Sequence, residues 1–223
     1  MKTALAAAAL CATVSGAAAE TMLHLSETAT VTVAPDRLVA VVRAEAAADS
    51  AASAQDQVNG LIREAVALAK AASGIAVATE QYNVWRLEPK NGAPSQWRAS
   101  QSILLHGQDG PTLLQLAGAL QQHGLAVESL GWELAPETAR SARTEAENRA
   151  LKALRGRADG IADAVGLQFD GYRSLTVGSA PPGAFRARTL AAASLAAQSE
   201  PSAEAEDVRV DATVEADIGL KPR

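Results

Sequence analysis

The nine residues VRVDATVEA occupy positions 208–216 and alternate between apolar and polar side chains without a break. Side chains that alternate with period two lie on opposite faces of a β-strand, so Val208, Val210 and Val214 share one face. The opposite face carries only charged residues and a threonine. This pattern predicts a C-terminal strand that returns to the main sheet, with one face in the core and the other in water.

A second alternating stretch lies near the other end of the chain, from Leu23 to Val33. Its threonines and valines are typical of a half-buried strand, and the turn residues Pro35 and Asp36 end it. A further strand follows from Arg37 to about Ala46. Because so short a turn separates the two strands, we expect them to form an antiparallel hairpin.

The chain between these ends alternates helical and extended patterns. The expected elements are a helix capped by Asp49 or Ser50 that ends near Ala72, a hairpin of strands 77–87 and 96–106, a short helix from Pro111 to Gly124, a strand at 125–134, a long helix from Pro136 to Gly166 and a strand at 169–177.

The resulting order, ββαββαβαββ, predicts an α+β fold of antiparallel hairpins and helices rather than repeated parallel crossovers. The long helix is rich in alanine, and its small residues recur every three or four positions along one stripe. We expect residues 20–223 to form one α+β domain that can divide into two subdomains. A flexible excursion rich in alanine and serine is expected at about 179–206.

Residues 1–19 have the pattern of a signal peptide. Lys2 precedes an apolar run at 4–14, and the small side chains of Ala17 and Ala19 suit a signal peptidase. The run is too short to cross a bilayer, which needs ~20 residues. We therefore expect cleavage near Ala19 and a periplasmic or secreted protein with no transmembrane segment.

Cleavage at that point also changes the charge and the cysteine content of the chain. Losing Lys2 leaves 19 Lys and Arg against 25 Asp and Glu, a net charge of −6. This charge argues against a nucleic-acid partner, because such proteins present a basic face. Losing Cys11, the single cysteine, leaves no disulfide or thiol chemistry.

The three histidines, His24, His106 and His123, are far apart and have no second ligand at helical or turn spacing. The chain has neither an HExxH motif nor a GxSxG motif. A Ser-His-Asp group assembled from distant positions stays open, because triads occur in unrelated sequence orders. We expect no catalytic residues, no metal and no cofactor. The arginines and acidic residues of the long helix are expected to pair with one another, with an anion-binding groove as the alternative.

Several ordered segments resemble the SIMPL-domain family, which includes bacterial periplasmic immunogenic proteins. They are the strand end Val31-Thr32-Val33-Ala34-Pro35-Asp36, Asn59 with Gly74-Ile75, Pro89 with Trp97-Arg98-Ala99-Ser100-Gln101, and the helix from Ala142-Arg143 to Ala164-Val165-Gly166-Leu167. The resemblance covers about residues 22–217. It implies an α+β fold, an envelope location, no cofactor and, in some members, homo-oligomers, and it supplies no catalytic residues.

One departure from the family concerns the first strand, where Glu27 and Ala29 stand in place of glycines. Glu27 falls on the apolar face, so this strand is expected to contact a neighbour differently. Trp85 and Trp97 each lie in a predicted strand, with core packing as the default. If both were exposed across their hairpin, they would mark a partner surface. Glu27, Trp85 and Trp97 are therefore the candidate interaction residues.

These observations favour an exported, non-enzymatic envelope protein that acts through protein–protein contacts or self-assembly, because open strand edges invite strand addition. The alternative is a small-ligand-binding or cofactor-free hydrolytic periplasmic protein. A deep pocket between the hairpins and the long helix, lined by His106 or the arginines, would favour that alternative.

Overall fold

A computed structural model describes residues 20–88, 95–179 and 201–223 of the chain. Its elements follow the predicted order ββαββαβαββ, which confirms the α+β fold. They are β1 (Thr21–Val33), β2 (Arg37–Ala48), α1 (Ala51–Ala71), β3 (Ile75–Leu87), β4 (Gln96–Gly107), α2 (Gly110–Gln122), β5 (Ala126–Glu133), α3 (Pro136–Ala164), β6 (Leu167–Ser179) and β7 (Val208–Pro222).

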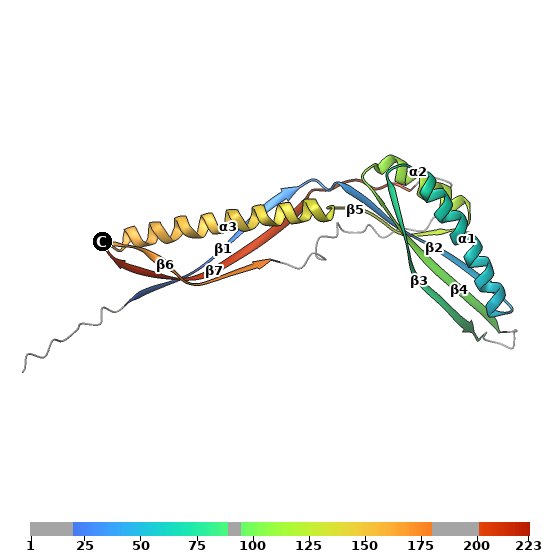
Figure 1. Ribbon diagram of the computed structural model, residues 1–223, viewed down its shortest axis with the longest axis horizontal. Coiled ribbons are helices and arrows are strands. Elements are labelled where there is room, and N and C mark those ends of the chain that lie inside the picture. Colours follow the sequence, from blue (N-terminus) through green and yellow to red (C-terminus); the bar gives the residue numbers. More distant parts are fainter. Residues whose placement is uncertain (1–19, 89–94, 180–200) are drawn as a thin grey trace, which may run out of the picture.

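The strands form two separate antiparallel sheets. One has three strands in the order β1-β7-β6, and the other has four in the order β3-β4-β2-β5. Figure 1 shows the sheets at opposite ends of an elongated molecule, with α3 along the three-stranded sheet and α1 and α2 on one face of the four-stranded sheet. Each sheet therefore needs a core of its own.

The prediction that the first two strands form a hairpin is wrong. β1 pairs with β7 along its whole length, from Thr21 opposite Leu220 to Val33 opposite Val208, whereas β2 pairs with β4 and β5. Tight hairpin turns need positive φ angles, and Pro35 cannot adopt one because its ring fixes φ near −65°. The segment 34–36 instead carries the chain from one sheet into the other (Figure 1).

The other predicted pairings are confirmed. β3 and β4 form an antiparallel hairpin, and β7 is the central strand of the three-stranded sheet, between β1 and β6. The apolar residues of β7, including Val210 and Val214, are buried. The predicted signal peptide lies outside the described residues, as does the part of the predicted excursion at 180–200.

The two cores differ in how closely helix and sheet approach. The four-stranded sheet buries larger residues, such as Leu38, Ile103 and Leu105, against α1 and α2. α3 instead buries a stripe of alanines with Leu154 against β1 and β7. Alanine at these positions allows the helix backbone to lie close to the sheet, because no long side chain keeps them apart.

The side chain of Asp36 holds the junction between the two sheets together. Its Oδ1 accepts a hydrogen bond from the Ala135 backbone N–H at 2.7 Å, and its Oδ2 accepts one from the Thr138 hydroxyl at 2.6 Å. Ala135 is the N-cap of α3 and has no side-chain oxygen, so Asp36 supplies the cap from a distant segment. Leu134 and Pro35 are buried beside it. Burial alone raises the pKa of Asp36, but the hydrogen bonds lower it by more, so this pKa lies below its usual value.

A third segment also joins the two ends of the molecule. Ala203, just before β7, packs against the core of the four-stranded sheet. Its carbonyl oxygen accepts a hydrogen bond from the Trp132 indole N–H at 3.1 Å.

Among the helices in the described ranges, none is both long and apolar enough to cross a membrane.

Candidate functional site

The face of the three-stranded sheet that points away from α3 is polar and brings together a serine, an aspartate and a histidine. Ser174 donates its hydroxyl hydrogen to Asp217 Oδ2 at 2.6 Å, and His24 Nδ1 lies 2.8 Å from Asp217 Oδ1. The Asp217 backbone N–H also donates to the Ser174 hydroxyl oxygen at 3.2 Å. The bond from Ser174, followed by that from His24, holds the pKa of the Asp217 carboxyl below its usual value.

These three residues do not have the geometry of a nucleophilic triad. In a triad, the histidine lies between the serine and the carboxylate and removes the proton of the hydroxyl. Here the carboxylate lies in the middle, and the serine hydroxyl contacts Asp217 rather than the imidazole. The cluster therefore links β1, β7 and β6 across the sheet, with the His24 imidazole bonded to the carboxylate rather than to the hydroxyl.

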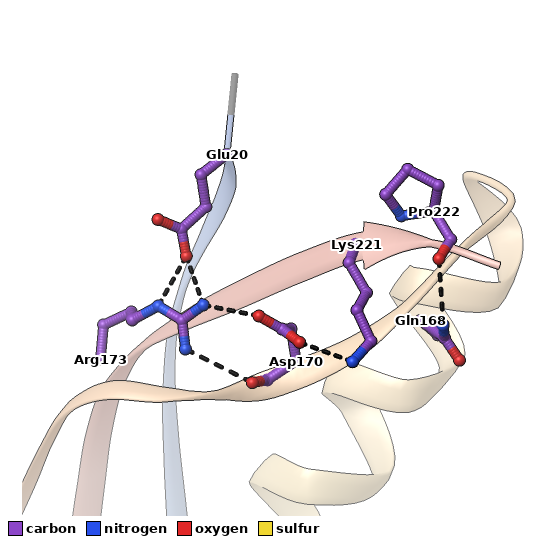
Figure 2. A network of polar contacts seen from close by, with 6 residues as sticks. All are labelled: Glu20, Gln168, Asp170, Arg173, Lys221 and Pro222. Carbon is purple, nitrogen blue, oxygen red and sulfur yellow. Dashed lines mark hydrogen bonds and ion pairs between the residues drawn. The ribbon is translucent and has the colours of Figure 1, made fainter. Parts of the chain in front are cut away.

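A second polar cluster lies at the end of the same sheet, and Figure 2 shows its members. Arg173 Nε donates to Glu20 at 2.6 Å, and its Nη2 donates to Asp170 at 2.7 Å. Lys221 Nζ lies 2.8 Å from the other Asp170 oxygen. The bonds from Lys221 and then Arg173 hold the pKa of Asp170 below its usual value.

Glycine in the central strand makes this second cluster geometrically feasible. A Cβ at Gly219 would lie 2.5 Å from the Arg173 guanidinium and 2.7 Å from the Glu20 carboxylate. The guanidinium thus crosses over β7 to reach the residue before β1, although β6 and β1 are not neighbours. Since each named charge has an opposite partner, we interpret the cluster as a clasp between the two outer strands.

The candidate residues Glu27, Trp85 and Trp97 do not form one surface. Glu27 lies in β1 beneath α3 and pairs with Arg157 of that helix at 2.5 Å, which agrees with its expected place on the apolar face. Trp97 of β4 packs against the core under α1. Trp85 of β3 is 36% exposed, and its register opposite Arg98 places it on the other face of the sheet from Trp97.

The histidines lie on three different elements. His24 is in β1, His106 is in β4 between Val39 and Ala76, and His123 is the C-cap of α2. Within residues 20–88, 95–179 and 201–223, no three His, Cys, Asp or Glu side chains lie close enough together to hold a metal ion.

The long helix carries a shallow depression of about 540 Å³ on its solvent side. Its described lining consists of α3 side chains, namely Ser141, Thr144, Glu145, Asn148, Arg149 and Lys152. His106 is not among them. Three acidic residues of α3, Glu137, Glu145 and Asp159, pair with arginines one turn away on the same helix. This pairing agrees with the expected ion-paired face.

Exposed apolar side chains gather on two edge strands. Five of the eight large hydrophobic residues that are exposed in the described part of the chain lie in β3 or β6, and they are Tyr82, Trp85, Tyr172, Leu175 and Val177. β3 is one of the two outer strands of the four-stranded sheet, and β6 is one of the two outer strands of the three-stranded sheet. Exposed apolar side chains thus lie on strands that have, within the described residues, a partner strand on one side only.

The apolar side chains of β6 become more exposed along the strand. Phe169, near its start, lies under the Arg155 guanidinium at 3.7 Å from the ring centroid and touches Tyr172 edge to face. Leu175 and Val177 pair with the buried residues Ala216 and Val214, so they point to the α3 side of the sheet. They are nevertheless 46% and 44% exposed.

The sequence showed which residues of β6 and β7 alternate, but not which residues face each other across strands. Three features depend on that pairing. They are the Ser174–Asp217–His24 cluster, the clasp, and the exposed apolar strip of β6 that Leu175 and Val177 form. A strand pattern at residues 169–177 with Leu175 and Val177 on one face was the only local signal for the strip.

Comparison with known protein families gives a match over most of the chain. Residues 23–218 match the model of the SIMPL family, which is described as a protein of unknown function (DUF541). The matched range begins within β1 and ends within β7. The family resemblance, first seen in the series of short sequence segments, is thus confirmed. No curated protein sequence matches the chain.

Proposed function

Because the chain belongs to the SIMPL family, we propose that it is an exported, non-enzymatic envelope protein that acts through protein–protein contacts, including self-assembly. The observation that carries this proposal is the concentration of exposed apolar side chains on the edge strands β3 and β6. Aromatic and aliphatic side chains are favoured at the centre of protein interfaces, and unpaired strand edges accept further strands.

Export is the part of the proposal that rests on the first 19 residues. The apolar run at 4–14 and the small residues Ala17 and Ala19 support cleavage before Glu20. N-terminal sequencing of the protein from the envelope fraction should begin at or next to Glu20. An Ala19→Arg variant should retain its leader and migrate as a larger chain. A native protein that keeps Met1 and stays in the cytosol would refute export.

Self-assembly is tested by the mass of the protein in solution. Sedimentation velocity across a range of micromolar concentrations should show a mass above that of one chain, with a concentration dependence that follows mass action. The mass should be insensitive to salt if apolar strand edges make the contact, because salt screens exposed charges rather than apolar surface. A mass that stays monomeric up to high micromolar concentration would overturn this part of the proposal.

A further inference from the structure

We infer that the outer edge of β6, over residues 174–178, pairs with the same edge of a second copy in antiparallel orientation, with the two-fold axis at Thr176. This inference rests on the proposed self-assembly and names the surface and the partner. It follows from a comparison of the four sheet edges and from the side chains that such a pairing brings together.

Three of the four sheet edges discourage strand addition. β3 carries Glu80 and Arg86 and has a register shift between Thr79 and Tyr82. β5 carries Glu128 and Glu133, and its pairing with β2 is also irregular. Charges and bulges on an edge strand oppose pairing with another chain. β1 is regular and exposes one large apolar side chain, Met22, but its apolar residues Leu25 and Val31 are already buried, so an added strand would gain fewer apolar contacts there than at β6.

The last part of β6, residues 174–178, has neither charged side chains nor a register shift. Its residues Ser174-Leu175-Thr176-Val177-Gly178 carry no charge. The two register shifts of β6 lie before Ser174, between Phe169 and Gly171 and between Tyr172 and Ser174. Asp170 and Arg173 also precede this stretch, and the clasp draws Arg173 inward over β7 (Figure 2). Among the described strands β6 pairs only with β7, and its outer edge is regular and uncharged from Ser174 to Gly178.

A second copy of this strand is complementary to the first. In an antiparallel pair centred on Thr176, Leu175 lies opposite the partner's Val177, and Val177 lies opposite the partner's Leu175. Both pairs lie on the α3 side, where these side chains are 46% and 44% exposed in the single chain. Thr176 meets the partner's Thr176 on the polar face. The contact is isologous, because each copy contributes the same surface, and it closes as a two-fold pair.

Disulfide trapping tests the register directly. In a Cys11→Ser background, Thr176→Cys introduces the only thiol in the chain. Directly opposed residues of an antiparallel pair have Cβ atoms about 4.5–5.5 Å apart, so mild oxidation should give a covalent dimer. The matched control is Glu215→Cys, which lies opposite Thr176 on β7 and is also exposed. In the proposed pair, the two control thiols would be about three strand spacings, roughly 14 Å, apart and should stay unlinked.

A second comparison separates failure of this inference from failure of self-assembly. The variant Leu175→Lys/Val177→Lys should reduce the wild-type assembly to a smaller species while its circular dichroism stays unchanged. The matched variant Tyr82→Lys/Trp85→Lys on β3 should leave that assembly intact. If the wild-type protein is monomeric, the proposed self-assembly fails. If it assembles but only the β3 variant dissociates, or if both thiols cross-link equally, self-assembly stands and the β6 interface is refuted.

Discussion

The carboxylate of Asp36 joins parts of the chain that are about a hundred residues apart. It accepts hydrogen bonds from the Ala135 backbone and the Thr138 hydroxyl, and its own backbone N–H donates to the Glu133 carbonyl at 3.2 Å. The neighbouring Arg37 pairs with the Glu133 side chain. Asp36 thus caps α3 and also ties the end of β5, the strand before α3, to the segment 34–36 that links the two sheets.

Replacing Asp36 with alanine should destabilise the protein by about 1–2 kcal/mol, which is the cost of losing a helix N-cap. The Ala135 N–H would lose its described partner at the same time. Urea unfolding of Asp36→Ala and of the wild-type protein measures the difference. Asp49→Ala is the control, because Asp49 is exposed and Ser50 caps α1 instead. Equal unfolding midpoints for Asp36→Ala and the control would contradict this role.

The effect of Asp36→Ala should depend on pH. A carboxyl whose pKa is lower in the folded state than in the unfolded state stabilises the fold above the unfolded value, ~3.9, and loses that contribution as pH falls through the folded value. The pKa of Asp36 is shifted in this direction. The difference in unfolding free energy between the wild-type protein and Asp36→Ala should therefore have its full value at pH 6 and become smaller below about pH 4. A gap that widens on acidification would show that Asp36 acts through some other contact.

At the scale of elements, α3 depends on the small size of the side chains that it buries. Ala142, Ala146, Ala150, Ala158 and Ala162 are nearly inaccessible against the three-stranded sheet. The alternating pattern of β7 and the alanine stripe of α3 were both visible in the sequence, because each is a local periodicity. The partner of β1 was not, since strand pairing between residues 21 and 220 is not a local property.

Enlarging one buried alanine should cost more than enlarging an exposed one on the same helix. Ala150 is 0% exposed and packs with Val214 and Ala216. Ala150→Leu should therefore destabilise the protein by about 1–3 kcal/mol, because added methylene groups in a packed core force backbone or rotamer shifts. Ala153→Leu, on the exposed side of α3, should have little effect. Thermal unfolding of the two variants checks this, and equal melting temperatures would argue against close packing of α3.

Removing β7 should abolish the three-stranded sheet, because β1 and β6 both pair with it and not with each other. A chain that ends at Glu206 should unfold or aggregate, as seen by size-exclusion chromatography and circular dichroism. A chain that ends at Lys221 is the control, since it loses only Pro222 and Arg223, whose ion pair with Asp163 is exposed. A melting temperature unchanged by the longer truncation would refute the central place of β7.

At the scale of the whole molecule, two sheets with separate cores are connected by the segment 34–36, the passage from β5 to α3 and the contact of Ala203. The sequence predicted every element in order but joined β1 to β2, because nothing local showed that the chain changes sheets at Pro35. The candidate interaction residues were also predicted from the pattern of individual strands, without knowledge of how the strands pair. Trp85 and Trp97 were adjacent in the hairpin, but register places them on opposite faces.

The pairing of β1 with β7 also determines how the molecule responds to force. Thr21 at the start of β1 lies opposite Leu220 near the end of β7, so the described ends of the chain leave the sheet at the same place. A load that pulls these ends apart acts across the strands and breaks the ladder one hydrogen-bonded pair at a time, because those bonds run perpendicular to the strands. The three-stranded sheet would therefore peel open from the termini under low tension, before the four-stranded sheet carries any load.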